Sequence, residues 1–511
     1  MAKRVRTDGY ADWKFKADGQ LTVFMALTIT LIFSIILAAA ESARIHAVKI
    51  LAQTAAELSV ASILAEYNIP LYEMYGIFAV DGNREDLTRD ILSYAKKNEG
   101  EGLFKFEAEQ VHISELTALF DMDYKPLEKE IVQYMKLSAK EVIEKQFTND
   151  SNTILDKVQK DKTAIGKEIL EKDAAAKAEA EAFEEKETEE TDGGGDRADV
   201  KDPRKSLADI LKDGILSCVL PKHMSVSECR LEEKVNASEN RMWCPQVTSF
   251  EDAAAVAEYL NEMNMAPKAV SKAEEGIIAV IVNEYILRHF KQAAVKTSDY
   301  ACDDFKTQLQ YENEYIICGH EADRDNLLDT INRVVLIRTV FNIAYLFTDA
   351  VKKAEIHAVA AALTTPLPFL ESVVYVLIMA AWGYAEGVVD ARNLMDKGTV
   401  PLFKNSTNWQ LSLSSLADGR LEGSTFQEGG LSYEDYLRIL LTLTERNKKY
   451  ERMENLIQAN IRLVEGYEGF DIRRCYYGIT CLFEYRAPSR FKAFSEKNGD
   501  YTINYQWSEC Y

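Results

Sequence analysis

The sequence lacks the short motifs by which common catalytic and nucleotide-binding sites are recognised. Its 511 residues contain no GxxxxGK(S/T), no GxGxxG after a strand pattern, no GxSxG and no HExxH. Paired carboxylates are uninformative in a chain with 82 acidic residues, so they do not indicate a hydrolase. We therefore predict that the protein is not an enzyme, and we assign no catalytic residue and no cofactor.

Metal-ligand spacing is also absent. The eight cysteines include no CxxC pair, and none of the six histidines has a second histidine four residues away. The stretch richest in ligand atoms, His320 to Asp323, is interpreted as a solvated turn before a helix, because neighbouring residues cannot all face one ion without a dedicated loop. We therefore predict no metal site.

The cysteines would permit disulfides in an exported domain. Cys475 and Cys481 would stand about 20 Å apart in one strand, far beyond the Cα separation of about 7 Å that a disulfide allows. These two cysteines therefore cannot pair with each other if they share a strand, and the connectivity of all eight stays open.

Positive charge is scarce. Lys and Arg total 60 against 82 acids, a net charge of -22, and no basic stripe occurs beyond the short N-terminal tail. Nucleic-acid binding needs lysines and arginines that replace counterions along the phosphates. The composition therefore excludes nucleic acid as a partner.

The sequence does contain one long apolar run near its beginning. Leu21 to Ala40 carry no charge, and at about 1.5 Å per helical residue they match a hydrocarbon core roughly 30 Å thick. The basic residues before the run predict a cytoplasmic N-terminus: Lys3, Arg4, Arg6, Lys14 and Lys16. We predict a single-pass protein of the cell membrane whose bulk is extracellular, with lipid as a partner. Cleavage after Ala40 stays open, although the run is longer than the roughly 7 to 15 residues of an export signal.

The helix is expected to continue beyond the membrane, because no helix breaker occurs before Pro70. We predict one helix from Leu21 to Tyr67 with a stripe of small and apolar residues at spacings of three and four. Small residues permit close approach of a second helix in a membrane, and Ala39, Ala43 and Ala47 share one face. These three alanines are the candidate helix-association site. The alternative is that the stripe packs on the globular part of the same chain.

The predicted fold class is α+β and mainly helical. A cytoplasmic tail (1–20), a transmembrane helix (21–40) and a stalk helix (41–68) lead into a small α+β domain (69–150). In that domain, residues 69–83 read as a strand-like segment that ends in a turn, residues 112–120 as a second strand, and a helix begins at Leu127.

The rest of the chain divides by composition. A charged helix and acidic linker (151–205) include residues 171–200, which hold twelve acids and four bases and have little to bury. The first half of this stretch is rich in Ala, Glu and Lys and can be helical. A mainly helical domain (206–465) follows, with a capping box at Ser432 and Asp435. Its apolar stretch at 372–385 is too short to span a membrane and predicts a buried helix. The tail (466–511) alternates like a β-hairpin.

Seven stretches carry a resemblance to known proteins. They are "GQLTVFMALTITLIFSIILAAAESAR" at 19–44, "YGIFAV" at 75–80, "LEKEIVQYMK" at 127–136, "NEYILRHF" at 283–290, "ENEYIICG" at 312–319, "GTVPLFKNSTNW" at 398–409 and "YEDYLRILL" at 433–441. Their order resembles an uncharacterised family of single-pass membrane proteins of Gram-positive bacteria, often encoded beside Tad/Flp pilus assembly genes.

The N-terminus is also similar to the pilin-like TadE/TadG group, in which a glycine precedes a long apolar helix. Here Gly19 precedes the run. A type IV prepilin would carry glutamate five residues after the cleaved glycine, whereas this chain has Phe24. Processing after Gly19 therefore stays open.

The resemblance implies a non-enzymatic, membrane-anchored extracytoplasmic protein that takes part in assembling or anchoring a Tad/Flp-like pilus or a related secretion apparatus. Its partners would be other membrane-anchored or pilin-like proteins. Two alternatives stay open, namely an exported ligand-binding or sensory ectodomain and an exported enzyme with an unrecognised active site. Residues 1–20 are too few for a signalling domain, which weakens the sensory alternative.

Overall fold

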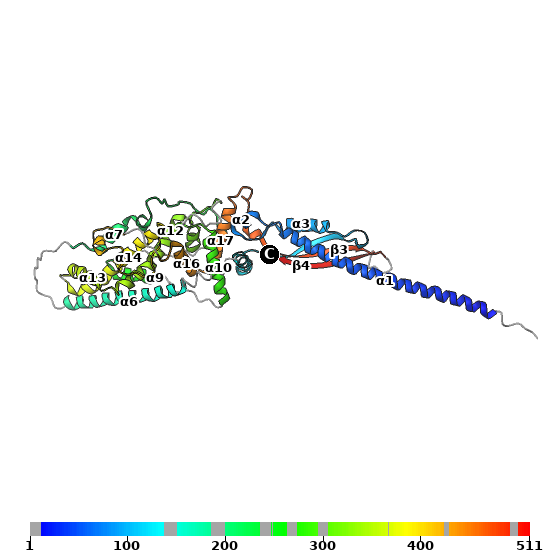
Figure 1. Ribbon diagram of the computed structural model, residues 1–511, viewed down its shortest axis with the longest axis horizontal. Helices are drawn as coiled ribbons and strands as arrows, with labels where there is room; N and C mark the ends of the chain where they lie inside the picture. The colour runs from blue at the N-terminus through cyan, green and yellow to red at the C-terminus, as the bar shows by residue number, and fades with distance from the viewer. Residues whose placement is uncertain are drawn as a thin grey trace, which may run out of the picture. The chain divides into compact units, whose positions relative to one another are not determined.

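The structure is a computed structural model that is mainly helical, with 64% of the chain in helices and one four-stranded sheet (Figure 1). It describes residues 12–136, 151–184, 200–235, 247, 249–262, 273–294, 305–365, 367–423, 429–490 and 499–511. The chain forms two compact units. The sheet unit comprises residues 1–69, 78–121 and 473–511, and the helical unit comprises residues 70–77 and 122–472.

The first helix, α1 (Asp12–Leu64), is uninterrupted over 53 residues. No proline occurs before Pro70 to break it. Side chains between Leu21 and Ala40 are almost all exposed, whereas from Glu41 onward buried positions recur every three or four residues. In Figure 1 the N-terminal half of α1 extends beyond the sheet and the C-terminal half lies along it. The predicted continuous helix is confirmed, although it ends at Leu64 and not at Tyr67.

The sheet is antiparallel and has β3 (Cys475–Pro488) in its interior. β3 pairs with β1 (Val80–Asp81), β2 (Glu107–Ala118) and β4 (Asp500–Cys510). The strand predicted at 112–120 is the second half of β2, and β3 and β4 form the predicted hairpin. Both Cys475 and Cys481 lie in β3, so they cannot form a disulfide with each other.

The core of the sheet unit lies between the sheet and two helices. α1 packs on β3 and β4, and α3 (Arg84–Lys97) packs on β2 and α1. Alternate residues of β3 point into this core, because side chains alternate across a strand. The buried set from the two contributing layers includes Val48, Ala52, Ala55, Val60 and Ile63 of α1 and Ile479, Cys481, Phe483, Tyr485 and Ala487 of β3. One face of the stalk helix therefore packs on the chain's own sheet.

The helical unit is built around two long buried helices, α12 (Asp323–Leu346) and α14 (Glu371–Met395), which pack against each other. Gly383 permits their close approach, since a Cβ there would lie 2.6 Å from Cγ1 of Ile343. The stretch at 372–385 is buried within α14, as predicted. The capping box of Ser432 and Asp435 is present at the start of α16.

The remaining elements are short, apart from α6. They are α2 (Ile69–Tyr75), η1 (Gly102–Phe104), α4 (Asp121–Met135), α6 (Ser151–Glu184), α7 (Pro203–Ile210), η2 (Leu211–Asp213), α8 (Ile215–Val219), α9 (Ala253–Glu262), α10 (Ala273–His289), α11 (Glu312–Cys318), α13 (Ala350–Leu363), η3 (Pro368–Leu370), α15 (Leu413–Ala417), α16 (Tyr433–Leu443), α17 (Arg446–Ile461) and η4 (Ile472–Arg474).

Two local predictions are wrong. Ile69–Tyr75 is helix α2 and not a strand, since a short apolar run has no periodicity that separates the two and Pro70 is tolerated in a first helical turn. The first half of the acidic stretch is helical, as its composition allows, but the expectation that it has little to bury is wrong, because it belongs to α6, which packs against α9 and buries Ala176. Residues 185–199 of that linker, and the predicted helix beyond Lys136, lie outside the described residues.

Candidate functional site

The protruding half of α1 has the surface of a membrane-spanning helix. Its large side chains from Leu21 to Leu37 are exposed. Its hydroxyls donate to carbonyl groups one turn earlier, as Thr30 does to Ala26 and Ser34 to Thr30, both at 2.8 Å. No polar group of these side chains is therefore left to lipid without a partner. The helix is long and apolar enough to cross a membrane.

Other described helices also pass a test of length and composition. Pro368–Met395 is apolar enough, but 94% of its most apolar window is buried in the helical unit. α12 and α13 pass only as a pair, and they are bent by 95°. A segment already covered by protein has no apolar surface to give to lipid, so α1 is the helix that fits a membrane anchor.

A buried ion pair lies directly after the apolar run, where the globular part of the chain begins. Arg44 donates from Nη2 to Oε1 of Glu41 at 2.7 Å and from Nε to Oε2 at 2.8 Å, and both side chains are buried. The Arg44 hydrogen bonds hold the pKa of Glu41 below its usual value. Arg44 also donates to the carbonyl oxygens of Leu103 and Pro488, at 3.3 and 2.8 Å. α1 is thus fastened to the sheet unit where it leaves the apolar run.

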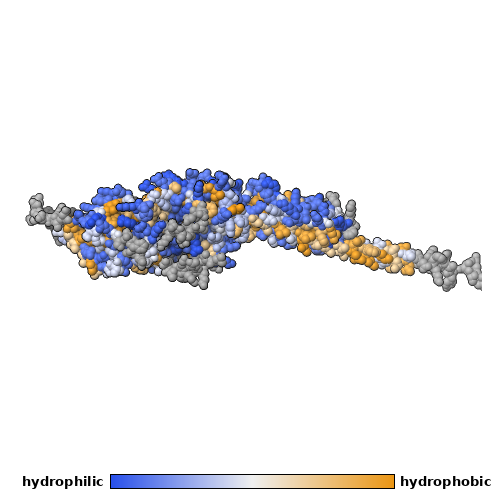
Figure 2. Space-filling view, turned by 45° about the horizontal axis from the view of Figure 1, so that its top comes forward, coloured by the Kyte–Doolittle hydropathy of each residue, from blue (hydrophilic) through white to orange (hydrophobic). Residues whose placement is uncertain are grey.

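The predicted association residues lie on the outer side of α1. Ala39 and Ala43 are exposed and Ala47 is half-buried. The same face continues through Ile50, Thr54 and Leu58, with Ile50 and Leu58 exposed by 64% and 50%. We call Ala39, Ala43, Ala47, Ile50, Thr54 and Leu58 the outward stripe, and it contains no charge. The apolar colouring of the protruding helix continues onto the adjoining sheet unit in Figure 2.

The stretch from His320 to Asp323 differs from the predicted solvated turn. Asp323 is fully buried and accepts hydrogen bonds from Oγ of Ser227 at 2.6 Å and from the backbone N–H of Gln310 at 2.8 Å. His320 contacts Asp329 through Nε2 at 2.5 Å. Asp323 therefore ties two loops to the start of α12. Among the described residues, no group of three or more His, Cys, Asp or Glu side chains could hold a metal ion.

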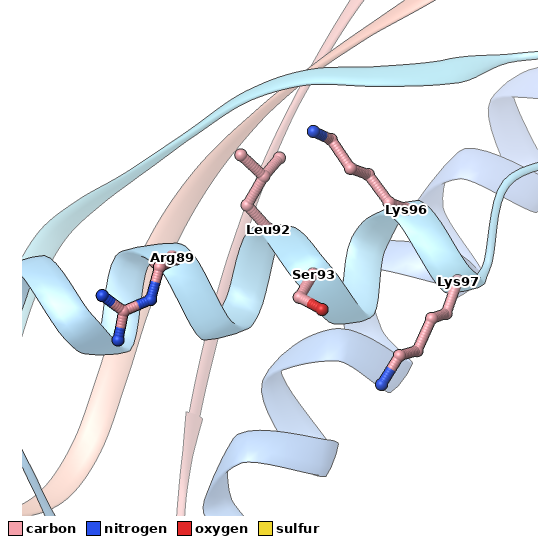
Figure 3. A pocket seen from close by; sticks show the side chains of 5 residues that line it. All are labelled: Arg89, Leu92, Ser93, Lys96 and Lys97. Carbon is pink, nitrogen blue, oxygen red and sulfur yellow. The ribbon is translucent and has the colours of Figure 1, made fainter.

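A hollow on the sheet unit lies over α3 (Figure 3). Arg89, Leu92, Ser93, Lys96 and Lys97 line it, and all come from this one helix. In Figure 3 the three cationic side chains point in different directions and do not converge on one point. Ligand sites are enclosed and have convergent polar groups, so this hollow is not a candidate active site.

The helical unit contains a buried network of four charges. Lys404 Nζ lies 2.6 Å from Oε1 of Glu386 and 2.7 Å from Oδ1 of Asp390. Arg338 Nε donates to the other oxygen of Asp390 at 2.9 Å. All four side chains are fully buried and their charges cancel. Because no solvent or substrate reaches them, we assign the network a structural role.

This network holds the loop that follows α14. Arg338 Nη1 donates to the carbonyl oxygens of Pro401 and Leu402, both at 3.0 Å. Glu386 accepts from the backbone N–H of Gln410 at 3.0 Å and of Leu411 at 2.8 Å. The stretch "GTVPLFKNSTNW" is therefore fixed to α12 and α14 by charged side chains.

Two buried carboxyl groups lie on α11, in the stretch "ENEYIICG". Glu312 accepts from the backbone N–H of Lys291 at 2.8 Å, and Glu314 accepts from that of Ala293 at 2.9 Å. Tyr433 also donates its hydroxyl to Glu314 at 2.8 Å. Burial raises the pKa of both glutamates to about 7. Both side chains are fully enclosed, so they affect stability and not a surface reaction.

Sequence reasoning missed these groups, although one signal was present. Glu386 and Asp390 stand four residues apart on an otherwise apolar helix, and two acids on one buried face require a cation nearby. The identity of that cation, Lys404, depends on the path of a loop. The Glu41 and Arg44 pair, three residues apart, had no signal that distinguished it from a surface pair.

Comparison with known proteins identifies one family. Residues 193–487 match the model of a family of unknown function, DUF5702. No curated protein and no solved structure matches the chain. The match covers more than half of the sequence, including most of the helical unit and almost all of β3. The chain therefore belongs to the DUF5702 family.

Proposed function

We propose that this protein is a non-enzymatic, membrane-anchored extracytoplasmic component that takes part in assembling or anchoring a Tad/Flp-like pilus or a related secretion apparatus. Its contact with a second membrane-anchored or pilin-like protein is made by the outward stripe of α1. The link to pilus systems comes from the resemblance of the sequence, and the physical argument comes from α1.

The observation that carries the proposal is the division of α1 into two faces. The inner face, with Val48, Ala52 and Ala55, is buried against the chain's own sheet. Apart from half-buried Ala47, the outward stripe is exposed, and it is uncharged from Ala39 to Leu58, about five helical turns. The part of this face beyond Ala40 lies outside the apolar run, where its exposed apolar side chains are costly to leave in water. A second helix that continues from the membrane would cover it.

Larger side chains at the first three positions of the outward stripe should disrupt this contact. We expect the triple variant Ala39→Leu, Ala43→Leu and Ala47→Leu to reduce crosslinking from a photoreactive residue at Thr54 by about tenfold, because leucine prevents close backbone approach. The measurement is crosslinking in intact cells to a pilin-like protein or to a second copy of the chain.

The matched control is Ser42→Leu, His46→Leu and Lys49→Leu, which adds the same leucines to an exposed flank of α1. This control should keep the crosslink. Undiminished crosslinking and piliation in the alanine variant, with membrane insertion intact, would refute the proposed contact.

The proposed orientation makes a separate prediction. Because five basic residues precede the apolar run, protease added to intact protoplasts should digest the chain after Glu41 and spare an epitope at the N-terminus. Immunoblots against both ends provide the readout, with lysed protoplasts as the control for epitope cleavage. A protected C-terminus together with a digested N-terminus would reverse the orientation.

A further inference from the structure

A short turn of the sheet unit lies beside the point where α1 leaves its apolar run. η1 (Gly102–Phe104) exposes two adjacent large apolar side chains, Leu103 by 60% and Phe104 by 38%. The next aromatic residue, Phe106, is fully buried in the core of the sheet unit. Phe106 thus fixes the end of the turn in the core, while the side chains of Leu103 and Phe104 are exposed to solvent.

Hydrogen bonds fix the position of this turn along α1. Arg44 donates to the carbonyl oxygen of Leu103 at 3.3 Å, and Arg490 donates from Nη2 to that of Gly102 at 2.6 Å. The backbone N–H of Arg490 in turn donates to Glu41 at 3.2 Å. Two independent contacts therefore hold η1 against the first turn of α1 after Ala40.

That position has a defined depth relative to a membrane. Arg44 follows Ala40 by four residues, which is about 6 Å along the helix axis. The headgroup region adds roughly 5 to 7 Å beyond the hydrocarbon core on each side. If the run from Leu21 to Ala40 fills the core, the carbonyl group of Leu103 lies at headgroup depth.

We infer that η1 is a membrane-contact site, in which Leu103 and Phe104 insert into the boundary between the lipid headgroups and the acyl chains. Insertion at that boundary lowers the free energy of apolar side chains of this kind, because it removes their surface from water. Arg490 and Lys105 flank the turn and both are exposed, with Lys105 Nζ 2.8 Å from Glu107 Oε1 and Arg490 Nη2 donating to Gly102, so each cation keeps further N–H groups that face solvent. Their cationic groups suit the phosphates of anionic lipids.

This contact differs from the helix contact proposed above. The outward stripe takes a protein partner, whereas η1 takes the lipid surface on the side of the sheet unit. With α1 and η1 both in contact with the membrane, the sheet unit has two points of attachment. The inference rests on α1 as the anchor and not on any pilus partner.

The test uses the full-length protein in vesicles of phosphatidylcholine and phosphatidylglycerol whose acyl chains are brominated close to the headgroups. A Phe104→Trp variant places an indole at the turn, and subtraction of the parent spectrum removes the five native tryptophans. The control is Leu482→Trp, at a position on β3 that is 44% exposed. It lies about 20 Å along the strand from Pro488.

We expect brominated lipid to quench the indole added at position 104 at least about threefold more than the indole added at position 482. Both substitutions are at exposed positions, and unchanged thermal midpoints would verify folding. Equal quenching at the two positions would overturn the inference. Protection of the first indole from aqueous acrylamide without quenching by lipid would also overturn it, since a protein such as a second copy would then cover the turn.

Discussion

The Lys404→Met variant is expected to lower the free energy of unfolding of the helical unit by about 3 to 5 kcal/mol, because removal of one partner leaves a buried charge uncompensated. Lys404 contacts both Glu386 and Asp390, and none of these side chains reaches solvent. Without the ammonium group, two buried carboxylates remain near one guanidinium group, that of Arg338. Urea unfolding of the full-length protein in detergent micelles, followed by tryptophan fluorescence, to which buried Trp382 contributes, measures the loss.

A second substitution separates charge from packing. Adding Glu386→Gln to Lys404→Met removes the surplus negative charge, while the amide oxygen can still accept one of the two backbone N–H groups that Glu386 binds. The double variant should therefore regain part of the lost stability. Lys205→Met, which removes an exposed ion pair with Glu251, should cost less than about 1 kcal/mol. A loss below about 1 kcal/mol in Lys404→Met would contradict the assigned role.

Stability of the helical unit should also depend on pH through its buried glutamates. The pKa of Glu314 is raised from 4.5 to about 7 in the folded state, so the folded state binds a proton more tightly than the unfolded state. Its contribution to stability is therefore present below about pH 4.5 and is lost as the pH rises to about 7. A shift of this size corresponds to about 3 kcal/mol. Glu312 acts in the same direction.

One buried histidine opposes this trend. Burial lowers the pKa of His289 to about 4, so between about pH 4 and 6.5 the unfolded state binds a proton that the folded state does not, and stability rises with pH across this window. The parent protein alone therefore does not isolate the glutamates. We expect the stability difference between Glu314→Gln and the parent to move in favour of the variant by about 2.5 kcal/mol between pH 5 and pH 8. A constant difference, measured by urea unfolding at each pH, would contradict this.

Local patterns predicted α1, β2, the terminal hairpin and the capping box of α16. In each case the signal lies in consecutive residues, such as the uncharged run from Leu21 to Ala40 or the Ser432 and Asp435 pair. The candidate association residues Ala39, Ala43 and Ala47 were also chosen from local spacing. Their exposure was not predictable, because it depends on which face of α1 the distant sheet covers.

The contacts that sequence reasoning missed join residues that local spacing does not relate, either 444 residues apart, as for Arg44 and Pro488, or 18 residues apart across a loop, as for Lys404 and Glu386. Arg44 reaches the carbonyl group of Pro488, and Lys404 reaches an acid on α14 from a loop. The packing of α6 against α9 was missed for another reason. Residues rich in alanine and glutamate have high helix propensity, and contact with α9 gives that helix a partner that its composition did not reveal.

The interior position of β3 determines when the sheet unit can fold during synthesis. α1 is synthesised first, but its inner face is covered by strands that begin at Cys475. Contacts of such long sequence separation form late, after the intervening chain has emerged. The helical unit, whose residues 122–472 are complete earlier, can therefore fold before the unit that flanks it in sequence. A chain truncated before β3 would keep its apolar helix but would lack the strands that cover Val48, Ala52 and Ala55. An incomplete molecule would therefore expose apolar surface directly after its apolar run.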